Sequence, residues 1–419
     1  MWHALLTLSL ATGPPQPAAP IGGAGGAIEV WSFERCLDHL LKQGVGTQEA
    51  QLRVRQARLG LEDARRAFLP VASATSGVYA GDLSEDGRSA DFYLSLRVAP
   101  ILDGYQKFFA RQMADLGLQL SQLDAERARG LVVAQMRGTY LRLLALTQAQ
   151  EHLAGAVDHQ RRLVEIAAAE ADPDLAAVRQ LEAKAAVQRE QMGLRELASR
   201  KAEEELRLRL LLGLPPEAPL AVDPETRVSE ILPPAGAGAS DPVTATASRA
   251  SLNLQIARRR LQAARFESYP QPLLRMGLNQ GGLEIKSGAY VFAGISLPLF
   301  DWGQRKRERA RLALEVQARE QEVEQEALRR RGELARLELA RQSLEQRGQD
   351  LLEGIDLIAM RLRAEVGLYQ AGRIGASELT RTQVELARER AEHALNRGGI
   401  WAAMCQREAL QAAGEADAE

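Results

Sequence analysis

APILDGYQK at residues 99–107 is matched by LPLFDWGQRK at residues 297–306. In both stretches a proline is followed three residues later by an aspartate, then by an aromatic residue and a glycine in either order, a glutamine and a basic residue. The offset between the two copies is 198 residues, and the matching positions are Pro100 with Pro298 and Asp103 with Asp301. A repeat of this kind predicts a fold built from two similar units.

A second match lies upstream of the first. Residues 52–70 align without a gap on residues 252–270, and Pro70 then falls on Pro270. Coincidence between two helices rich in Ala and Arg is the alternative, and it explains this match better than the proline–aspartate match. Because the two matches have nearly the same offset, we interpret the chain as a duplication.

Between the paired prolines the apolar residues alternate with polar or small ones, as in a strand with one apolar face. Strands are predicted at about 71–81 and 91–99, and again at about 271–280 and 289–297. Strands of nine to eleven residues have the length of a tilted strand that spans a membrane. The strand–helix junctions are predicted where proline ends one element and redirects the chain, followed in two cases by an aspartate: Pro70, Pro100, Asp103, Pro270, Pro298 and Asp301.

Long helices are predicted elsewhere, from about 104 to 168 and from about 302 to 370, with return helices at about 175–212 and 377–412. The second long helix carries a coiled-coil-type stripe with a seven-residue register. Arg330, Arg341 and Gly348 interrupt this stripe. Aromatic residues make up only 5% of the chain and charged residues 26%, as expected for long helices.

The predicted organisation has five parts. Residues 1–24 form an export signal, 28–213 the first repeat, 214–240 a non-helical connector, 241–412 the second repeat and 413–419 a tail. We expect the connector to pack on the outside of the helices, with a free flexible linker as the alternative. No stretch after the signal is long and apolar enough for a membrane-spanning helix, so entry into a membrane would require the strands.

Composition and residue types argue against several functions. A net charge of −2 gives no footprint for nucleic acid. Cys36 and Cys405 have no metal-site spacing; they are interpreted as small buried residues, with a disulfide as the alternative. His152 and His159 lie on one helix face without a carboxylate cluster and are expected to face a lumen or solvent. We therefore predict no metal, no cofactor and no enzymatic activity.

The paired junctions, the segment LRLLLGLP at residues 208–215 and the segment YQAGRIGASELTRTQVEL at residues 369–386 resemble the TolC-like outer membrane factor family. The resemblance covers about residues 30–410. It implies an α-helical barrel in the periplasm and a twelve-stranded β-barrel in the outer membrane, shared by a homotrimer. It also implies an exit duct for a tripartite efflux pump or a type I secretion system, working with a periplasmic adaptor and an inner-membrane pump.

The same resemblance assigns roles at the tip of the second helical hairpin. Glu378 falls where the family narrows its tunnel with an acidic side chain, whereas Arg381 stands where some members have a second acid. A Glu378/Arg381 ion pair that holds the closed state is one reading, and a solvated pair on a helix is the other. Gly367, Gly372 and Ile374 match the positions that dock the adaptor.

A soluble periplasmic coiled-coil adaptor or scaffold is the alternative from a different functional class. It would share the helical hairpins and the export signal, but it would not require two hairpins of membrane-length strands. The sequence leaves the cargo open, because drug efflux, metal-ion efflux and protein secretion use the same kind of conduit.

Overall fold

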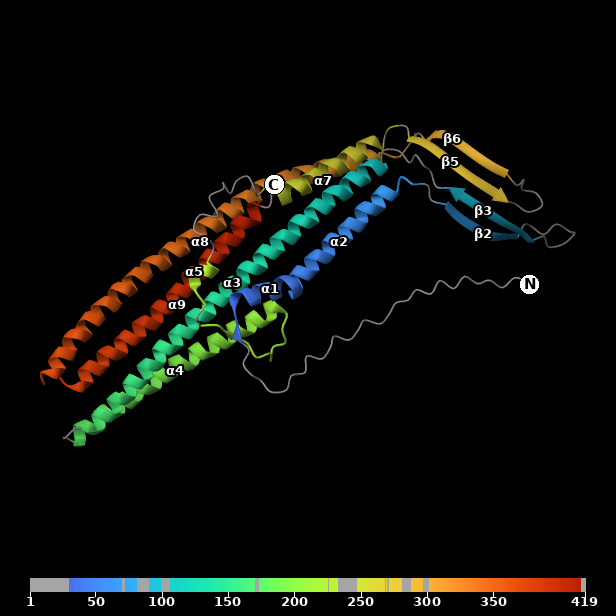
Figure 1. Ribbon diagram of the computed structural model, residues 1–419. Coiled ribbons are helices and arrows are strands. Elements are labelled where there is room, and N and C mark those ends of the chain that lie inside the picture. The colour runs from blue at the N-terminus through green and yellow to red at the C-terminus, as the bar shows by residue number, and fades with distance from the viewer. Residues whose placement is uncertain are drawn as a thin grey trace, which may run out of the picture.

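The computed structural model describes residues 30–69, 72–80, 90–98, 106–169, 173–224, 226–232, 247–267, 269, 271–280, 288–296 and 301–415. Two helix–hairpin–helix units follow each other along the chain, and Figure 1 shows their strands at one end of a long helical body and the helical tips at the other. The first unit contains β1 (Val30–Trp31), α1 (Phe33–Gln43), α2 (Val45–Arg66), β2 (Ala72–Ala80), β3 (Ala90–Val98), α3 (Gln106–Ala168) and α4 (Pro173–Leu212).

A short connector and the second unit complete the chain. They contain β4 (Ala221–Val222), α5 (Val228–Ile231), α7 (Ala247–Phe266), β5 (Gln271–Gln280), β6 (Gly288–Ser296), α8 (Gln304–Gln370) and α9 (Ala376–Glu415). The strand bounds differ from the predicted ones by at most one residue. The connector, expected to be non-helical, includes one turn of helix and a strand, and α9 continues three residues into the segment expected to be a tail.

The four long strands form one antiparallel sheet in the order β2-β3-β5-β6. Each hairpin pairs internally, and β3 pairs with β5 so that the two units join, for example at Leu96 opposite Leu278. Strands β2 and β6 are therefore the edges of the sheet.

Helices α3 and α9 pack closely and connect the two units along their length. At Gly398 of α9 an added Cβ would lie 2.6 Å from the Cβ of Ala145 in α3, so only glycine allows this approach. Arg137 of α3 also forms an ion pair with Glu408 of α9 at 2.5 Å. Helix α4 packs on the far side of α3, and α8 packs on α9.

The three interruptions of the apolar stripe on α8 are contacts with α9 or salt bridges. Arg330 is buried and donates to the carbonyl oxygens of Leu410 and Gln411 at 2.5 and 3.2 Å, near the C-terminal end of α9. Arg341 pairs with Glu338 at 2.6 Å, and Glu338 also pairs with Arg407 of α9.

Gly348 leaves room for the buried Asn396 of α9, whose Nδ2 donates to the carbonyl of Leu344 at 2.8 Å. A polar residue or a glycine in this stripe therefore aligns α8 with α9 rather than weakening the contact.

A compact apolar core lies near the middle of the helical body, where α1, β1, β4 and α5 pack against α3 and α4. Strand β1 pairs in parallel with β4, so the start of the described chain is joined to the connector. Tyr140 of α3 is fully buried, and its hydroxyl lies 3.1 Å from the carbonyl oxygen of Trp31 and 3.0 Å from Thr226 Oγ1.

Both cysteines lie in this core as free thiols. Burial raises the pKa of Cys36 to about 12 and that of Cys405 to about 11. Cys405 faces Gly138 of α3, whereas Cys36 interacts electrostatically with Tyr140. Both cysteines therefore act as small apolar residues.

We expect Gly398→Ala to destabilise the protein by about 1–3 kcal/mol, because the new methyl group must push α9 away from Ala145. Thermal unfolding followed by circular dichroism measures the change. Gly354→Ala on α8 is the control, since no atom lies within 4 Å of its added Cβ and alanine favours a helix. Equal unfolding midpoints for the two variants would contradict the close approach.

Candidate functional site

The tip of the hairpin between α8 and α9 is built around a left-handed glycine. Gly372 has φ of 69°, and its N–H donates to the carbonyl of Tyr369 at 2.9 Å. The N–H of Arg373 donates to the carbonyl of Leu368 at 2.9 Å. These two bonds form the Schellman motif that ends a helix and reverses the chain, and the positive φ explains why glycine is needed. Gly372 thus has a structural role at the position expected to dock an adaptor.

The other two predicted docking residues lie beside this turn. Gly367 is in the last turn of α8, and no atom lies within 4 Å of the position of an added Cβ. No contact within the described chain requires glycine at position 367. Without a side chain, this position leaves the backbone of α8 uncovered at the surface. Ile374 follows the turn and is half-buried.

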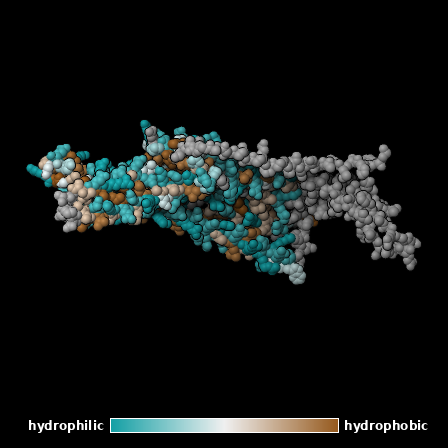
Figure 2. Space-filling view, turned by 90° about the horizontal axis from the view of Figure 1, so that it is seen from below, coloured by the Kyte–Doolittle hydropathy of each residue, from teal (hydrophilic) through white to brown (hydrophobic). Residues whose placement is uncertain are grey.

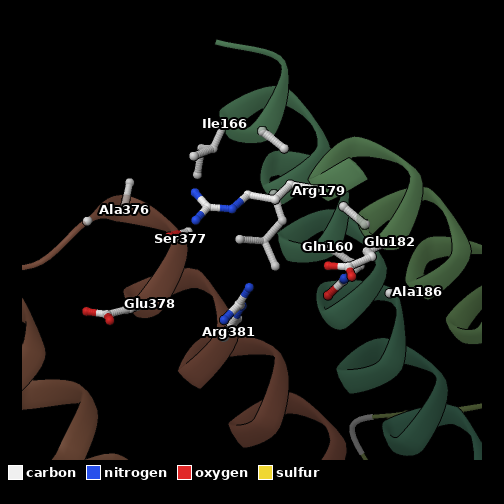
Figure 3. A pocket seen from close by; sticks show the side chains of 13 residues that line it. Gln160, Ile166, Arg179, Glu182, Ala186, Ala376, Ser377, Glu378 and Arg381 are labelled. Atoms are coloured by element: carbon white, nitrogen blue, oxygen red, sulfur yellow. The ribbon is translucent and has the colours of Figure 1, made fainter. Parts of the chain in front are cut away.

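A pocket of about 640 Å³ separates this tip from the hairpin formed by α3 and α4. Figure 3 shows Arg179 of α4 extending toward Ser377 of α9, while Arg381 points into the same space from one turn further along α9. Glu182 lies beside Gln160 on the opposite wall. The sequence analysis did not identify Arg179 or Glu182, because nothing local indicates which face of α4 meets α9.

Glu378 and Arg381 face different neighbours, and no ion pair joins them. Glu378 is exposed in the first turn of α9, and its charge contributes to the environment of Arg361 on α8. A hydrogen bond from Nε of Arg361 to Glu365 at 2.7 Å is the main cause that raises the pKa of Arg361, with further contributions from Glu385 and Glu378. Arg361 forms ion pairs with Glu365 at 2.7 Å and with Glu385 of α9 at 3.5 Å.

Three of the five histidines, His152, His159 and His393, lie on α3 and α9, further from the hairpin tips. His152 and His159 of α3, with Arg390 of α9, line a pocket of about 300 Å³. Burial is the main cause that lowers the pKa of His152 and of His393, with Arg390 and Arg397 as the next largest causes respectively. His152 also acts on His393 and lowers its pKa further.

The strand–helix junction before α8 is held by an aspartate. Oδ1 of Asp301 accepts from the N–H of Gly303 and Oδ2 accepts from the N–H of Arg305, both at 3.1 Å. The Arg305 N–H bond is the main cause that lowers the pKa of Asp301. Trp302 and Gly303 both have positive φ, so the chain turns sharply here. The other predicted junction residues lie outside the described part of the chain: Pro70, Pro100, Asp103, Pro270 and Pro298.

The part of the chain that the structure describes has neither a metal-type cluster nor a membrane-spanning helix. No group of three or more His, Cys, Asp and Glu side chains in the described ranges is arranged to hold a metal ion. Among the helices that the structure describes, none has the length and apolar character to cross a membrane.

Solved structures with the same fold include an outer membrane protein and two outer membrane channels. VceC from Vibrio cholerae matches with a TM-score of 0.74 and 16% identity over 91% of this chain and 96% of that one. MtrE from Neisseria gonorrhoeae matches with a TM-score of 0.74 and 18% identity over 91% and 88%. CmeC from Campylobacter jejuni matches with a TM-score of 0.73 and 15% identity over 92% and 86%.

No family model and no curated protein sequence matches the chain. At identities this low the structural likeness establishes the fold. The predicted TolC-like fold, with two tandem helix–hairpin–helix units, is confirmed at that level.

We expect the stability to fall as the pH is lowered from 7.5 to 5.5. His152 and His393 have depressed pKa values in the folded state, so below pH of about 6.5 the unfolded chain binds protons more readily than the folded chain. The contribution of these two histidines to the free energy of unfolding is fully present above a pH of about 6.5. It is lost as the pH falls through their lower pKa values in the folded state.

Thermal unfolding at a series of pH values measures this dependence. The double variant His152→Gln/His393→Gln should show a shallower loss of midpoint over the same range, whatever its midpoint at pH 7.5. A slope as steep as that of the unmodified protein would show that these histidines are not its source.

Proposed function

We propose that the chain is one subunit of a homotrimeric outer-membrane exit duct that acts as a passive, gated conduit. The observation that carries the proposal is the four-stranded sheet with two unpaired edges, β2 and β6. Unpaired backbone groups in lipid cost several kcal/mol each, so such a sheet enters a membrane only when its edges are paired. Three copies would supply twelve strands and close the sheet.

The exposed apolar side chains support the same assembly. They are concentrated on α8 at one edge of the helical layer and on α2 and α4 at the other, while α9, between α3 and α8, carries none of those among the described residues. Figure 2 shows hydrophobic patches along an otherwise hydrophilic helical body. The large apolar residues of these helices that are more than half exposed are Leu314, Leu328, Leu339, Leu357 and Met360 on α8, Val178, Leu181, Met192 and Leu210 on α4, and Leu52 and Leu59 on α2.

Because the two edges of the helical layer differ, copies of the chain would associate head to tail, with the α8 edge of one against the α2 and α4 edge of the next. A head-to-tail contact that closes on itself gives a ring. In such a ring α8 of one copy would cover α2 and α4 of the next. The layer would then enclose a tunnel that continues the strands. The small core at the middle of the body would lie outside the tunnel, because a folded core inside it would obstruct the conduit.

The hairpin tips are the proposed gate and docking region. The solved structure of MtrE, which has this fold, is described as the open state of that channel. This description supports the proposal that the fold has both an open and a closed arrangement. Glu378 and Arg381 are proposed to act at the constriction, and Gly367, Gly372 and Ile374 at the contact with a periplasmic adaptor. An inner-membrane pump would supply the energy and select the cargo, so the duct itself would need neither a catalytic residue nor a cofactor.

The assembly is tested by fractionation and cross-linking. We expect recovery with outer membranes, detergent-dependent extraction and a cross-linked trimer. Ile295→Arg should lower the yield of trimer modestly, because this side chain of β6 is 71% exposed and lies one residue before the strand ends, where an arginine facing lipid near the interface costs up to about 1 kcal/mol. Ile295→Val is the control. Release as a soluble monomer or dimer after osmotic shock would favour the adaptor or scaffold instead.

The gate is tested by single-channel conductance in planar bilayers. We expect Glu378→Ala to raise the conductance, because it removes a charged side chain in the first turn of α9, next to the tip. Glu353→Ala, an exposed acid far from the tip on α8, is the control. An unchanged conductance in the Glu378 variant would leave Glu378 as a solvated surface residue.

A further inference from the structure

A pocket of about 470 Å³ lies where α2, α3 and α7 approach the sheet, far from the hairpin tips. Three arginines from three different helices line it: Arg65 of α2, Arg111 of α3 and Arg259 of α7. One carboxylate, Asp115, also lines the pocket. The lining therefore has a formal charge of +2.

The arginines of this pocket lack carboxylate partners, unlike their neighbours in sequence. No carboxylate of the described chain forms an ion pair with Arg65, Arg111 or Arg259, and Arg259 only bonds Gln262, at 2.9 Å. By contrast, Arg66, next to Arg65, forms an ion pair with Glu62 at 3.8 Å. The two arginines that flank Arg259 are also paired, Arg258 with Glu320 at 2.9 Å and Arg260 with Glu315 at 3.3 Å. Asp115 accepts from Gln119 at 3.2 Å.

The three arginines are exposed to solvent, whereas one buried polar atom of the pocket is unsatisfied. Oε1 of Gln112 is buried and has no hydrogen-bond partner. A buried amide without a partner costs about 1–3 kcal/mol, so a ligand with a hydrogen-bonding group gains by entering. Phe108, which is 51% exposed, forms an apolar side of the same pocket.

The pocket lies close to the level at which the helices become strands. Arg65 is one residue before the end of α2, Arg111 five residues after the start of α3, and Arg259 seven residues before the end of α7. At 1.5 Å per residue these positions are within about 11 Å of the junction. Gln112 and Tyr140 are 28 residues apart, which is four repeats of the seven-residue register of a coiled coil, and this register puts the pocket on the side of α3 that faces the small core.

We propose that this pocket binds a phosphate group, with the phosphodiester of an anionic phospholipid headgroup as its source. Guanidinium groups bind phosphate oxygens in bidentate fashion, and three of them can surround one phosphate. The choice of a lipid rests on the proposed function, which puts this level beside the headgroups of the inner leaflet and this side of α3 outside the tunnel. Gln112 would bond a headgroup hydroxyl, and Phe108 would contact the glycerol or acyl carbons.

Binding is measured on the purified full-length protein in a non-ionic detergent by titration of its thermal midpoint. The probes are dioctanoyl phosphatidylglycerol, inorganic phosphate, and dioctanoylglycerol as a lipid without phosphate. We expect a saturable rise with phosphatidylglycerol and none with dioctanoylglycerol. Arg65→Gln/Arg111→Gln should weaken this binding by about tenfold or more, since each arginine contributes charge-assisted hydrogen bonds. Arg55→Gln, an exposed position on α2, is the matched control.

The outcomes separate the source of the phosphate from the existence of the site. A rise with inorganic phosphate that is lost in the double variant would support the site with a soluble anion as its ligand. Equal binding by the double variant and the Arg55 control would overturn the proposal. Cross-linking and conductance of the double variant are measured in parallel, because a failure of the proposed channel would appear there and not in the titration.

Discussion

Helices α3 and α9 approach so closely at Ala145 and Gly398 that a single methyl group does not fit between them. This contact joins the first unit of the duplication to the second, since α3 belongs to one and α9 to the other. It also fixes how the two hairpin tips stand relative to each other, and therefore the pocket that holds Arg179 and Arg381. At the opposite end the pairing of β3 with β5 joins the same two units. The rest of the helical layer is arranged around this central pair.

A layer that is one helix thick buries little apolar surface. Ion pairs between charged side chains therefore form part of the contact between neighbouring helices. Glu190 of α4 is buried and pairs with Arg388 of α9, although α3 lies between these helices. Arg142 of α3 pairs with Glu204 of α4 at 3.2 Å. Truncating one member of a buried pair leaves the other charge unsatisfied, so such pairs fix register more than they add stability. This accounts for a chain with few aromatic residues and many arginines.

The duplication and the position of its hairpins follow from the sequence, because alternation and helical periodicity are local patterns. The partners of individual polar residues do not. The sequence pattern indicates interruptions of an apolar stripe at Arg330, Arg341 and Gly348. In the structure, Arg330 and Gly348 contact α9, and Arg341 forms an ion pair with Glu338. Glu378 and Arg381 have the spacing of an ion pair, yet Figure 3 shows their side chains pointing apart, and Arg361 of α8 pairs with Glu365 and Glu385. Which helix lies across from a residue is decided by tertiary contacts that no local pattern encodes.

The parallel pairing of β1 with β4 joins residues 30–31 to residues 221–222, across the whole first unit. The entropy of closing so long a loop is lost before the two short strands gain anything from pairing. The hairpin of α3 and α4, whose contacts are local, can form much earlier. We therefore expect the pairing of β1 with β4 to come late in folding, after α3 and α4 present the apolar surface on which Trp31 and Leu220 pack. The small sheet thus acts as a check on the order of folding: an incorrectly packed first unit would leave the N-terminal strand without a partner.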